Sequence, residues 1–342
     1  MSVPVLETRD LAVEFAGPEG PVRVVDKVSF TLDPGEVLGL VGESGSGKSV
    51  TLLAVMGLLP PTARIVSGEV RFLGQRIDTA DETALQRLRG GDMAMIFQDP
   101  MTSLNPVLRI GTQIAEAIAL HRPGLGRRAI AARVVELLGM VGVPDPEARS
   151  RQFPHEFSGG MRQRAMIAMA IANEPKLLIA DEPTTALDVT IQAQVMEVLE
   201  EVRARTGSSM VLVTHDLGLV AETAQRIAVM YAGRIAELAP TEAIFERPAH
   251  PYTIGLLASL PSLDATGEML ASIPGQPPDM RQRPPGCAFH PRCHLGRDRT
   301  RCAGERPVLA ALGDGRLAAC HYAREAEAGA ATAIPSGVGV AG

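Results

Sequence analysis

The sequence predicts an α/β fold with a mostly parallel sheet, and three observations support this prediction. Apolar, strand-like runs alternate with helical patterns between residues 37 and 238. A glycine-rich segment typical of phosphate binding follows the first of these runs. After about residue 240 the composition changes, because prolines cluster and cysteines occur for the first time. Strands that alternate with helices form parallel sheets covered on both faces, so we expect such a core followed by an appended region.

The N-terminal residues predict a small antiparallel layer that leads into this core. Apolar residues alternate at positions 11–15 and 28–32, and each run ends near glycine or proline. Alternation of this kind is typical of strands with one buried face. We expect Gly68–Phe72 to rejoin the same layer.

The segment Gly42–Ser49, called here the phosphate loop, fits the pattern G-x-x-x-x-G-K-[ST]. It lies between an apolar run at 37–41 and a helical pattern at 50–59 that stops at two prolines. Glycines let backbone N–H groups surround phosphate oxygens, and the positive end of the new helix faces the same anion. Lys48 would reach the β- and γ-phosphates, and the Ser49 hydroxyl would bind Mg²⁺. The alternative is a glycine-rich turn that matches by chance. The predicted nucleotide-binding residues here are Gly42, Ser44, Gly45, Ser46, Gly47, Lys48, Ser49 and Val50.

The later elements continue the alternation of strands and helices. Strands are predicted at 93–97, 177–180, 210–214, 227–230 and 234–238, the last two being the final strands of the fold. Helices are predicted at 111–141, with a break at Pro123-Gly124, at 159–172 and at 191–205. The helical stretch at about 100–170 separates two sheet strands, which indicates an inserted helical subdomain.

Polar side chains follow three of these strands at the point where each strand ends. Asp181 and Glu182 follow one strand, Gln98 another and His215 a third. Ligands bind at this edge of an open α/β sheet. Asp181 would hold Mg²⁺ indirectly, through the ligands that surround the ion, and Glu182 would be the general base for the attacking water. Gln98 would contact both Mg²⁺ and the water, and His215 would donate to the γ-phosphate. Each residue taken alone also fits an ordinary polar strand end.

Ser158-Gly159-Gly160, called here the second glycine motif, begins another predicted helix. Ser158 can cap the helix, and the two glycines expose N–H groups at its positive end. The motif is therefore a second candidate anion site. The alternative is an ordinary capped helix.

The charge and the apolar pattern exclude several classes of protein. The net charge of −6 provides no strongly basic face, so no nucleic-acid partner is expected. The first residues lack a charged segment followed by an apolar core, so no secretory signal is expected. No apolar run approaches the roughly 18 residues that span a bilayer. We therefore expect a cytoplasmic chain that does not cross a membrane.

All four cysteines lie in the appended region, namely Cys287, Cys293, Cys302 and Cys320. The spacing C-x5-C-x8-C-x17-C lacks the close C-x2-C pair of common zinc sites. Four thiolates suit an iron–sulfur cluster or a tetrahedral zinc ion, and a short segment with little core gains stability from either. Unliganded thiols are the third alternative, whereas disulfides are not expected in the cytoplasm.

Taken in order, these motifs resemble the nucleotide-binding subunit of an ATP-binding cassette (ABC) transporter over about residues 5–240. The strings that carry the resemblance are GESGSGKS, Gln98, SGGMRQR, LLIADEP, Ala186-Leu187-Asp188 and His215. It implies a P-loop NTPase of ABC type, with a RecA-like parallel-sheet core, an N-terminal antiparallel β subdomain and an inserted helical subdomain. We accordingly expect an ABC ATPase domain at 1–240, a C-terminal extension with the cysteine cluster at 241–324 and a disordered tail at 325–342.

The resemblance also implies roles that the spacing alone leaves open. Subunits of this family pack head to tail, so Ser158, Gly159 and Gly160 would contact the γ-phosphate of ATP held by the partner. Asp188 would lie along the same interface. Phe15 stands where the family carries an aromatic side chain that stacks on adenine.

Longer strings resemble one subfamily, the importers of oligopeptides, dipeptides and nickel. These strings are Gln98–Pro106 and His250–Thr253, together with Met161 in place of a common Gln and Thr185 in place of a common Ser. Some members of this subfamily bind a [4Fe–4S] cluster through a similar four-cysteine tail. The resemblance therefore favours an iron–sulfur cluster over Zn²⁺ here.

The function implied is an ATPase that powers uptake of di- or oligopeptides from the cytoplasmic face of the membrane. Its partners would be a second ABC ATPase subunit, paralogous or identical, two membrane permease subunits and an extracytoplasmic substrate-binding protein. Import of nickel or another small solute is the alternative. A soluble ABC ATPase acting on DNA or ribosomes would carry coiled coils, two cassettes or basic arms. A P-loop kinase or GTPase would not need the second glycine motif.

Overall fold

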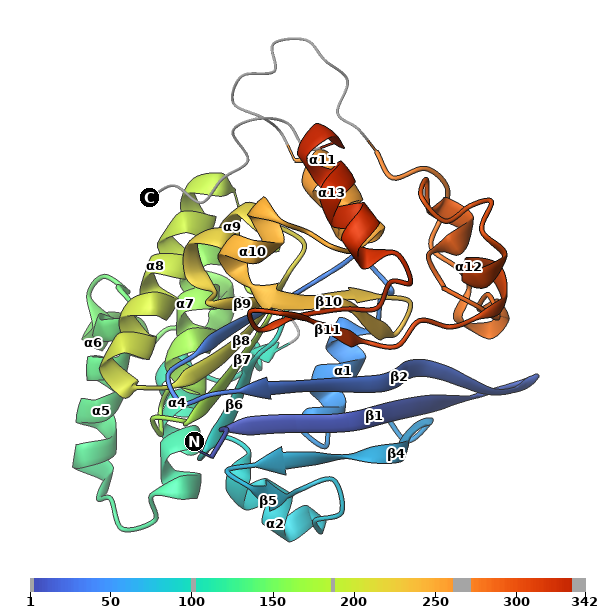
Figure 1. Cartoon of the computed structure of the whole chain (residues 1–342). Coiled ribbons are helices and arrows are strands. Elements are labelled where there is room, and N and C mark those ends of the chain that lie inside the picture. Colours follow the sequence, from blue (N-terminus) through green and yellow to red (C-terminus); the bar gives the residue numbers. More distant parts are fainter. Residues whose placement is uncertain (1–2, 100–102, 186–187, 261–271, 334–342) are drawn as a thin grey trace. The chain divides into compact units, whose positions relative to one another are not determined.

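The structure is a computed structural model that describes residues 3–99, 103–185, 188–260 and 272–333 (Figure 1). The chain divides into two compact units, and each is described by itself. The first unit comprises Met1–Leu6, Thr31–Glu36 and Arg71–Val213, and the second comprises Glu7–Phe30, Val37–Val70 and Thr214–Gly342. The predicted domain boundary at 240 stays a prediction, because these units are defined by contacts within each of them.

The first unit contains a parallel sheet of buried strands. Its strands are β6 (Met93–Ile96), β7 (Leu177–Asp181) and β8 (Ser209–Thr214). The unit also contains the short exposed strand β5 (Gln75–Arg76), which pairs antiparallel with Arg71 and Phe72. β7 pairs with β6 and with β8, both in parallel, from Met93 opposite Leu177 to Asp181 opposite Val213. Every residue of β7 and β8 is buried, which is typical of parallel strands covered on both faces.

Helices make up the rest of the first unit, including the predicted insert. They are α2 (Glu82–Leu88), α4 (Ile110–His121), α5 (Arg127–Met140), α6 (Pro146–Ser150), the 3-10 turn η1 (Pro154–Glu156), α7 (Gly159–Ala170) and α8 (Val189–Thr206). The predicted break between α4 and α5 is present. Ile110, Ile114 and Ile118 recur every four residues along the buried face of α4, so the helical pattern is explained by packing. In Figure 1, α4, α5 and α6 lie together as one group.

The second unit contains the predicted N-terminal layer. Its strands are β1 (Leu6–Gly17), β2 (Gly20–Leu32) and β4 (Ala63–Phe72), arranged in the order β2-β1-β4. Two residues connect β1 to β2, a length that joins antiparallel strands. β4 begins five residues before the predicted Gly68, so the prediction found only its second half.

The second unit also holds the strand that leads to the phosphate loop. β3 (Val37–Val41) pairs in parallel with β9 (Arg226–Tyr231), and β9 pairs antiparallel with β10 (Arg234–Pro240). The helices of this unit are α1 (Lys48–Val55), α9 (Leu217–Thr223), α10 (Thr241–Glu246), α11 (Pro251–Ala258), α12 (Thr300–Gly304) and α13 (Ala323–Ala333), with 3-10 turns η2 (Met280–Gln282) and η3 (His290–Arg292). The prediction ended α1 too late, at Leu59.

Two predictions about the appended region were wrong. β10 is not the last strand, because β12 (Arg316–Ala318) pairs with it and β11 (Ala310–Gly313) pairs with β12. The tail expected to be disordered from residue 325 is helical as far as Ala333. Ala326 and Ala330 of this helix are buried against Ile254, because small side chains four residues apart let α13 approach α11 closely (Figure 1). Residues 334–342 lie outside the described part of the chain.

No described helix is both long enough and apolar enough to span a bilayer.

Candidate nucleotide-binding and hydrolysis site

The phosphate loop lies between β3 and α1 of the second unit, in the predicted strand–loop–helix context. All residues of β3 are buried, and α1 begins at Lys48 with Gly47 as its N-cap. Ser46 and Lys48 are buried, whereas Ser44, Gly45 and Ser49 are exposed and Val50 is half-buried. The loop therefore exposes Ser44, Gly45 and Ser49 to solvent, whereas Gly42 and the segment Ser46–Lys48 are buried.

Gly42 shows why the loop must begin with glycine. Its φ angle of 150° is one that L side chains rarely adopt. A Cβ atom at this position would lie 2.2 Å from the carbonyl oxygen of Met230 on β9. Since that neighbour is backbone and cannot rotate away, the turn out of β3 is possible only for glycine.

Lys48 is held inside the loop by backbone carbonyls. Its ammonium group donates to the carbonyl oxygens of Gly42 at 2.7 Å and Glu43 at 3.1 Å. The side chain is buried, so its positive charge lies inside the loop, next to Gly42 and Glu43. A buried ammonium group at the N-terminus of a helix is suited to bind a polyphosphate.

The acids at the end of β7 lie in the first unit, and one of them has an unusual backbone. Asp181 is the last residue of β7 and is buried. Glu182 follows with a φ angle of 48°, in the left-handed region, and its N–H donates to the carbonyl of Val213 at 2.9 Å. Such a conformation costs a non-glycine residue about 1–3 kcal/mol and concentrates at functional sites.

The structure brings Gln98 to Glu182, as expected for residues at one edge of a parallel sheet. The Gln98 amide donates to Glu182 Oε2 at 3.0 Å, and the Thr185 hydroxyl donates to the same oxygen at 2.8 Å. One carboxylate oxygen is thus fixed by two donors. Sequence analysis gave Thr185 no role of this kind, although it noted the residue as a departure from the common Ser.

The second glycine motif begins α7, and its serine is a helix cap. Ser158 Oγ accepts from the N–H of Met161 at 3.3 Å, and Ser158 and Gly159 are exposed. Asp188 caps α8 in the same way, accepting from the N–H of Ile191 at 3.0 Å. Both residues also fit the alternative of ordinary capping, so their contact with a partner's nucleotide stays a prediction. Ala186 and Leu187, which precede Asp188 in the predicted string, lie outside the described residues.

The remaining predicted residues are placed in the second unit. His215 is exposed between β8 and α9. Phe15 lies half-buried on β1. Their proposed contacts with the γ-phosphate and with adenine stay predictions.

Sequence analysis missed a contact between the phosphate loop and the appended region. Arg292 and Tyr252 both bind Glu43, the second residue of the loop. Tyr252 belongs to the string His250–Thr253 that carries the subfamily resemblance, which was the available signal. Arg292 stands next to Cys293 in a proline-rich segment and has no local pattern that indicates a partner.

The four cysteines converge on one small pocket of the second unit, called here the cysteine pocket. Its other lining residues include His250, Phe289 and Gly296. A Cβ atom on Gly296 would lie 3.0 Å from the sulfur of Cys302 and 3.3 Å from that of Cys293, so glycine is needed beside these sulfurs. Burial raises the pKa of the Cys287 thiol to about 11 and that of Cys320 to about 12. The thiols are thus protonated at neutral pH unless a cation is bound.

The predicted metal site is not supported as a preformed single-ion centre. Within the described residues, no group of three or more His, Cys, Asp or Glu side chains is arranged to hold a metal ion. Tetrahedral zinc requires ligand atoms about 2.0–2.3 Å from one point. The zinc alternative therefore finds no support, and an iron–sulfur cluster is not shown either.

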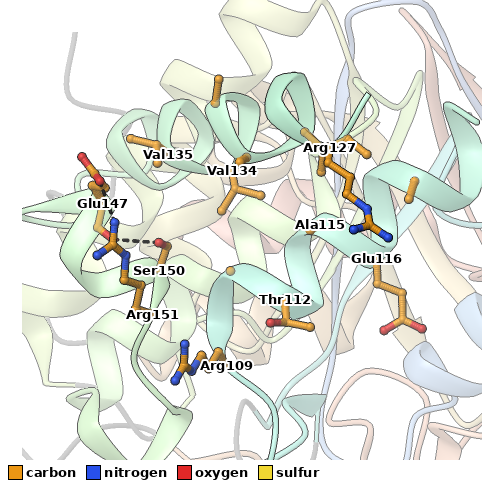
Figure 2. Close-up of a pocket in the computed structure, with 15 residues that line it drawn as sticks. Arg109, Thr112, Ala115, Glu116, Arg127, Val134, Val135, Glu147, Ser150 and Arg151 are labelled. Atoms are coloured by element: carbon orange, nitrogen blue, oxygen red, sulfur yellow. Dashed lines mark hydrogen bonds and ion pairs between the residues drawn. The ribbon is translucent and has the colours of Figure 1, made fainter. Parts of the chain in front are cut away.

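A groove lies among α4, α5 and α6 of the first unit (Figure 2). Its volume is about 830 Å³. Alanine and valine side chains such as Ala115 and Val134 line its floor, and charged side chains of both signs surround it. The rim contains an ion pair between Arg151 and Glu147 with an N···O distance of 2.8 Å. This surface is apolar in the middle and charged at the edge, which is typical of an interface.

Known proteins share both the sequence and the fold of this chain. The ABC transporter family model matches residues 25–185, and the model for the oligopeptide/dipeptide transporter C-terminal region matches residues 236–302. The chain is 50% identical to the dipeptide transport ATP-binding protein DppD of Escherichia coli over 93% of this chain and 96% of that protein. It is 50% identical to the oligopeptide transport ATP-binding protein OppD of Mycobacterium tuberculosis over 93% of this chain and 52% of that protein.

A solved structure confirms the fold class. The ATP-binding cassette MJ0796, in a dimeric post-hydrolysis state bound to ADP and Pi, has a TM-score of 0.63 and 25% identity, covering 69% of this chain and 98% of that one. The predicted ABC ATPase fold is therefore confirmed. On this evidence the chain belongs to the ATP-binding subunits of ABC transporters, in the group that carries the oligopeptide/dipeptide transporter C-terminal region.

Proposed function

We propose that the chain hydrolyses ATP to power uptake of di- and oligopeptides, and that it acts at the cytoplasmic face of the membrane. The observation that supports this most is the joint presence of a phosphate loop with a buried Lys48 and a peptide-transporter C-terminal region. DppD and OppD are named as dipeptide and oligopeptide transport proteins. Import of nickel or another small solute by the same architecture is the alternative.

Hydrolysis would use the acid fixed at the end of β7. Glu182 would take a proton from the water that attacks the γ-phosphate, and the Gln98 amide would orient that water. Lys48 would neutralise charge on the β- and γ-phosphates, and His215 would donate to the γ-phosphate. Thr185 would keep the Glu182 carboxylate in place through its hydrogen bond.

Mg²⁺ would be held by oxygen donors, which the chain provides. The Ser49 hydroxyl, the Gln98 amide oxygen and the Asp181 carboxylate match the hard ligands that Mg²⁺ prefers. When bound, the ion supplies positive charge to the phosphate oxygens. A site with a single carboxylate is consistent with Mg²⁺ that keeps several waters.

The second glycine motif would act on a nucleotide held by a partner subunit. Ser158 and Gly159 are exposed at the start of α7, so their donors are accessible to another chain. Asp188 and Gly160 would join the same contact. The partner would be a second ABC ATPase subunit, identical or paralogous.

The groove among α4, α5 and α6 would receive a short helix from a membrane permease. Its apolar floor and mixed-charge rim suit an amphipathic helix, and it lies on the inserted helices of the unit that also carries Glu182. Two permeases and an extracytoplasmic substrate-binding protein would complete the transporter. Ala115→Arg should abolish co-purification of the permeases, and an unchanged yield would contradict this placement.

The cysteine pocket would hold a [4Fe–4S] cluster. All four cysteines line one pocket. Because burial raises the pKa of the Cys287 and Cys320 thiols, their thiolates would need bound positive charge, which a cluster supplies. Such a cluster is larger than one ion, so its cysteines need not meet at a single point. Anaerobic purification followed by iron, sulfide and zinc analysis tests this. A folded region with neither iron nor sulfide would contradict it.

The test of the proposed function is uptake by a deletion strain complemented with wild type or Lys48→Ala. Labelled dipeptide, pentapeptide and Ni²⁺ are the three cargoes. Lys176→Ala is the matched control, because that lysine is exposed and pairs with Asp92 at the surface. We expect Lys48→Ala to lose peptide uptake and the control to keep it. Loss of Ni²⁺ uptake alone would replace peptide import with nickel import, and no loss of any cargo would contradict both.

A further inference from the structure

The appended region reaches the phosphate loop through one buried arginine. Arg292, at the end of η3, forms two parallel hydrogen bonds with the Glu43 carboxylate, Nη1 to Oε2 at 2.7 Å and Nη2 to Oε1 at 3.0 Å. The exposed fraction of the side chain is 5% for Arg292 and 26% for Glu43. A bidentate pair of this kind fixes the orientation of both partners as well as their distance.

A second group from the appended region holds the backbone of the same loop residue. The N–H of Glu43 donates to the hydroxyl of Tyr252 on α11 at 2.8 Å. Tyr252 is fully buried and packs against Tyr231 and Phe289, with ring centroids 4.5 Å and 5.4 Å away. The side chain and the amide of Glu43 are thus both held by rigid, buried groups.

Arg292 is itself fixed on every side. Its Nε donates to the carbonyl of Pro274 at 3.0 Å and its Nη2 to that of Ile273 at 3.3 Å. The guanidinium carbon lies 5.8 Å from the ring centroid of Tyr231 and 5.9 Å from that of Phe289. Because the guanidinium cannot turn without losing several contacts, it acts as a fixed point for the loop.

The held residue in turn holds the cation of the site. Lys48 donates to the carbonyls of Gly42 and Glu43, so these two carbonyls set the position of its ammonium group. A chain of contacts therefore runs from Arg292 and Tyr252 to Glu43, and from Glu43 to Lys48. Groups that are held in place before the ligand arrives lose less entropy when it binds.

We propose that Arg292 is a positioning residue for the phosphate loop, so that the C-terminal region sets the ATP affinity of the subunit. The inference rests on the proposed function only in taking ATP as the ligand. Arg292 would touch neither ATP nor the attacking water. It orders the loop through Glu43, and Tyr252 supports the same residue through its amide.

The test is equilibrium binding of ATP to the purified full-length chain, together with steady-state hydrolysis. Glu43→Gln and Arg292→Gln should each raise the Kd about tenfold, the range expected for contacting charged pairs. The double variant should be no worse than either single one, because both remove the same contact. The kcat at saturating ATP should stay within about twofold of wild type, since the Glu43–Arg292 pair orders the loop before ATP binds. Arg281→Gln is the matched control, because Arg281 is an exposed arginine of the same region paired with Asp279.

Misfolding cannot account for the expected pattern. Glu43→Gln keeps the shape of the side chain and leaves the C-terminal region untouched, so it reports on the contact even if Arg292→Gln destabilises its surroundings. Wild-type affinity in Glu43→Gln, or additive losses in the double variant, would overturn the proposal. If Lys48→Ala binds ATP as well as wild type, the proposed function fails instead, and the two failures are distinct.

Discussion

Two glycine motifs begin helices in this chain, and their surroundings differ. In the phosphate loop Ser46, Gly47 and Lys48 are buried, and the loop is held by carbonyl, carboxylate and hydroxyl contacts within its own unit. In the second glycine motif Ser158 and Gly159 are exposed. The first motif begins α1 and the second begins α7, so both present the positive end of a helix.

This difference separates a site that can bind an anion within one subunit from a site that can bind an anion carried by a second molecule. The phosphate loop has its cation in place, so it is equipped to bind a nucleotide without a partner. The second motif has its N–H groups at the surface, where a second molecule can bring an anion to them. A shared site that forms only when two subunits meet needs one motif of each kind.

The largest expected effect tests whether the two motifs act together on one ATP. Glu182→Gln removes the proposed base but keeps the hydrogen-bonding shape of the side chain. We expect kcat to fall about a thousandfold, within the range for loss of a general base, while ATP still binds. Because bound ATP then persists, light scattering should show a stable dimer with ATP and a monomer without it. Turnover at the wild-type rate would refute Glu182 as the base.

The next effect separates the two motifs by their own variants. Gly42→Ala places a Cβ atom 2.2 Å from the Met230 carbonyl, so ATP affinity of the isolated subunit should fall about a hundredfold. Ser158→Ala removes an exposed donor and a cap, and we expect unchanged affinity but about tenfold lower turnover. Gly124→Ala is the control, since a Cβ there meets no atom within 4 Å. Weaker binding in Ser158→Ala would show that the second motif serves its own subunit.

The smallest effect concerns two buried titratable residues of the second unit, Glu237 and His250. Glu237 on β10 accepts from the N–H groups of Ala249 and His250 at 2.7 Å and 3.0 Å. Burial raises the pKa of Glu237 from 4.5 to about 7 and lowers the pKa of His250 from 6.5 to about 4. The folded state therefore binds the proton of Glu237 more tightly, and that of His250 less tightly, than the unfolded state does.

The two shifts have opposite signs in their dependence on pH. The contribution of Glu237 to stability is lost as pH rises from 4.5 to about 7, whereas that of His250 is lost as pH falls from 6.5 to about 4. Between these limits the two slopes offset each other. In Glu237→Gln the free energy of unfolding should fall by about 1.4 kcal/mol more per pH unit of acidification than in wild type. Denaturant titrations between pH 5 and 6 measure the difference. Equal slopes in the two proteins would contradict the raised pKa of Glu237 in the folded state.

The sequence was sufficient where a motif is local, and where the alternation of strands and helices brings strand ends to one edge of the sheet. The phosphate loop was predicted because glycine spacing, an apolar strand and a helix lie within a short stretch. Gln98 and Glu182 were expected at one sheet edge because parallel strands end there, and their contact at 3.0 Å agrees with that logic.

The sequence was insufficient where a contact joins distant segments that carry no local pattern. Arg292 gave no local signal, since its partner is an ordinary glutamate inside a motif whose glycines attract attention. The helix α13 was missed because alanine-rich segments also occur in disordered tails. Only packing distinguishes them, and here Ala326 and Ala330 face Ile254. β12 was missed because it is only three residues long and depends on β10 for its pairing.

The pair between Glu43 and Arg292 also has a consequence for the synthesis of the chain. The two residues are 249 positions apart. A ribosome that adds about 5–20 residues per second needs roughly 12–50 seconds to make that interval, and β3 and α1 have left the exit tunnel long before it ends. For most of translation the nascent chain therefore carries a complete phosphate loop without the contact from Arg292. Nucleotide affinity would then mature only as the last part of the chain emerges, after the rest of the cassette has been made.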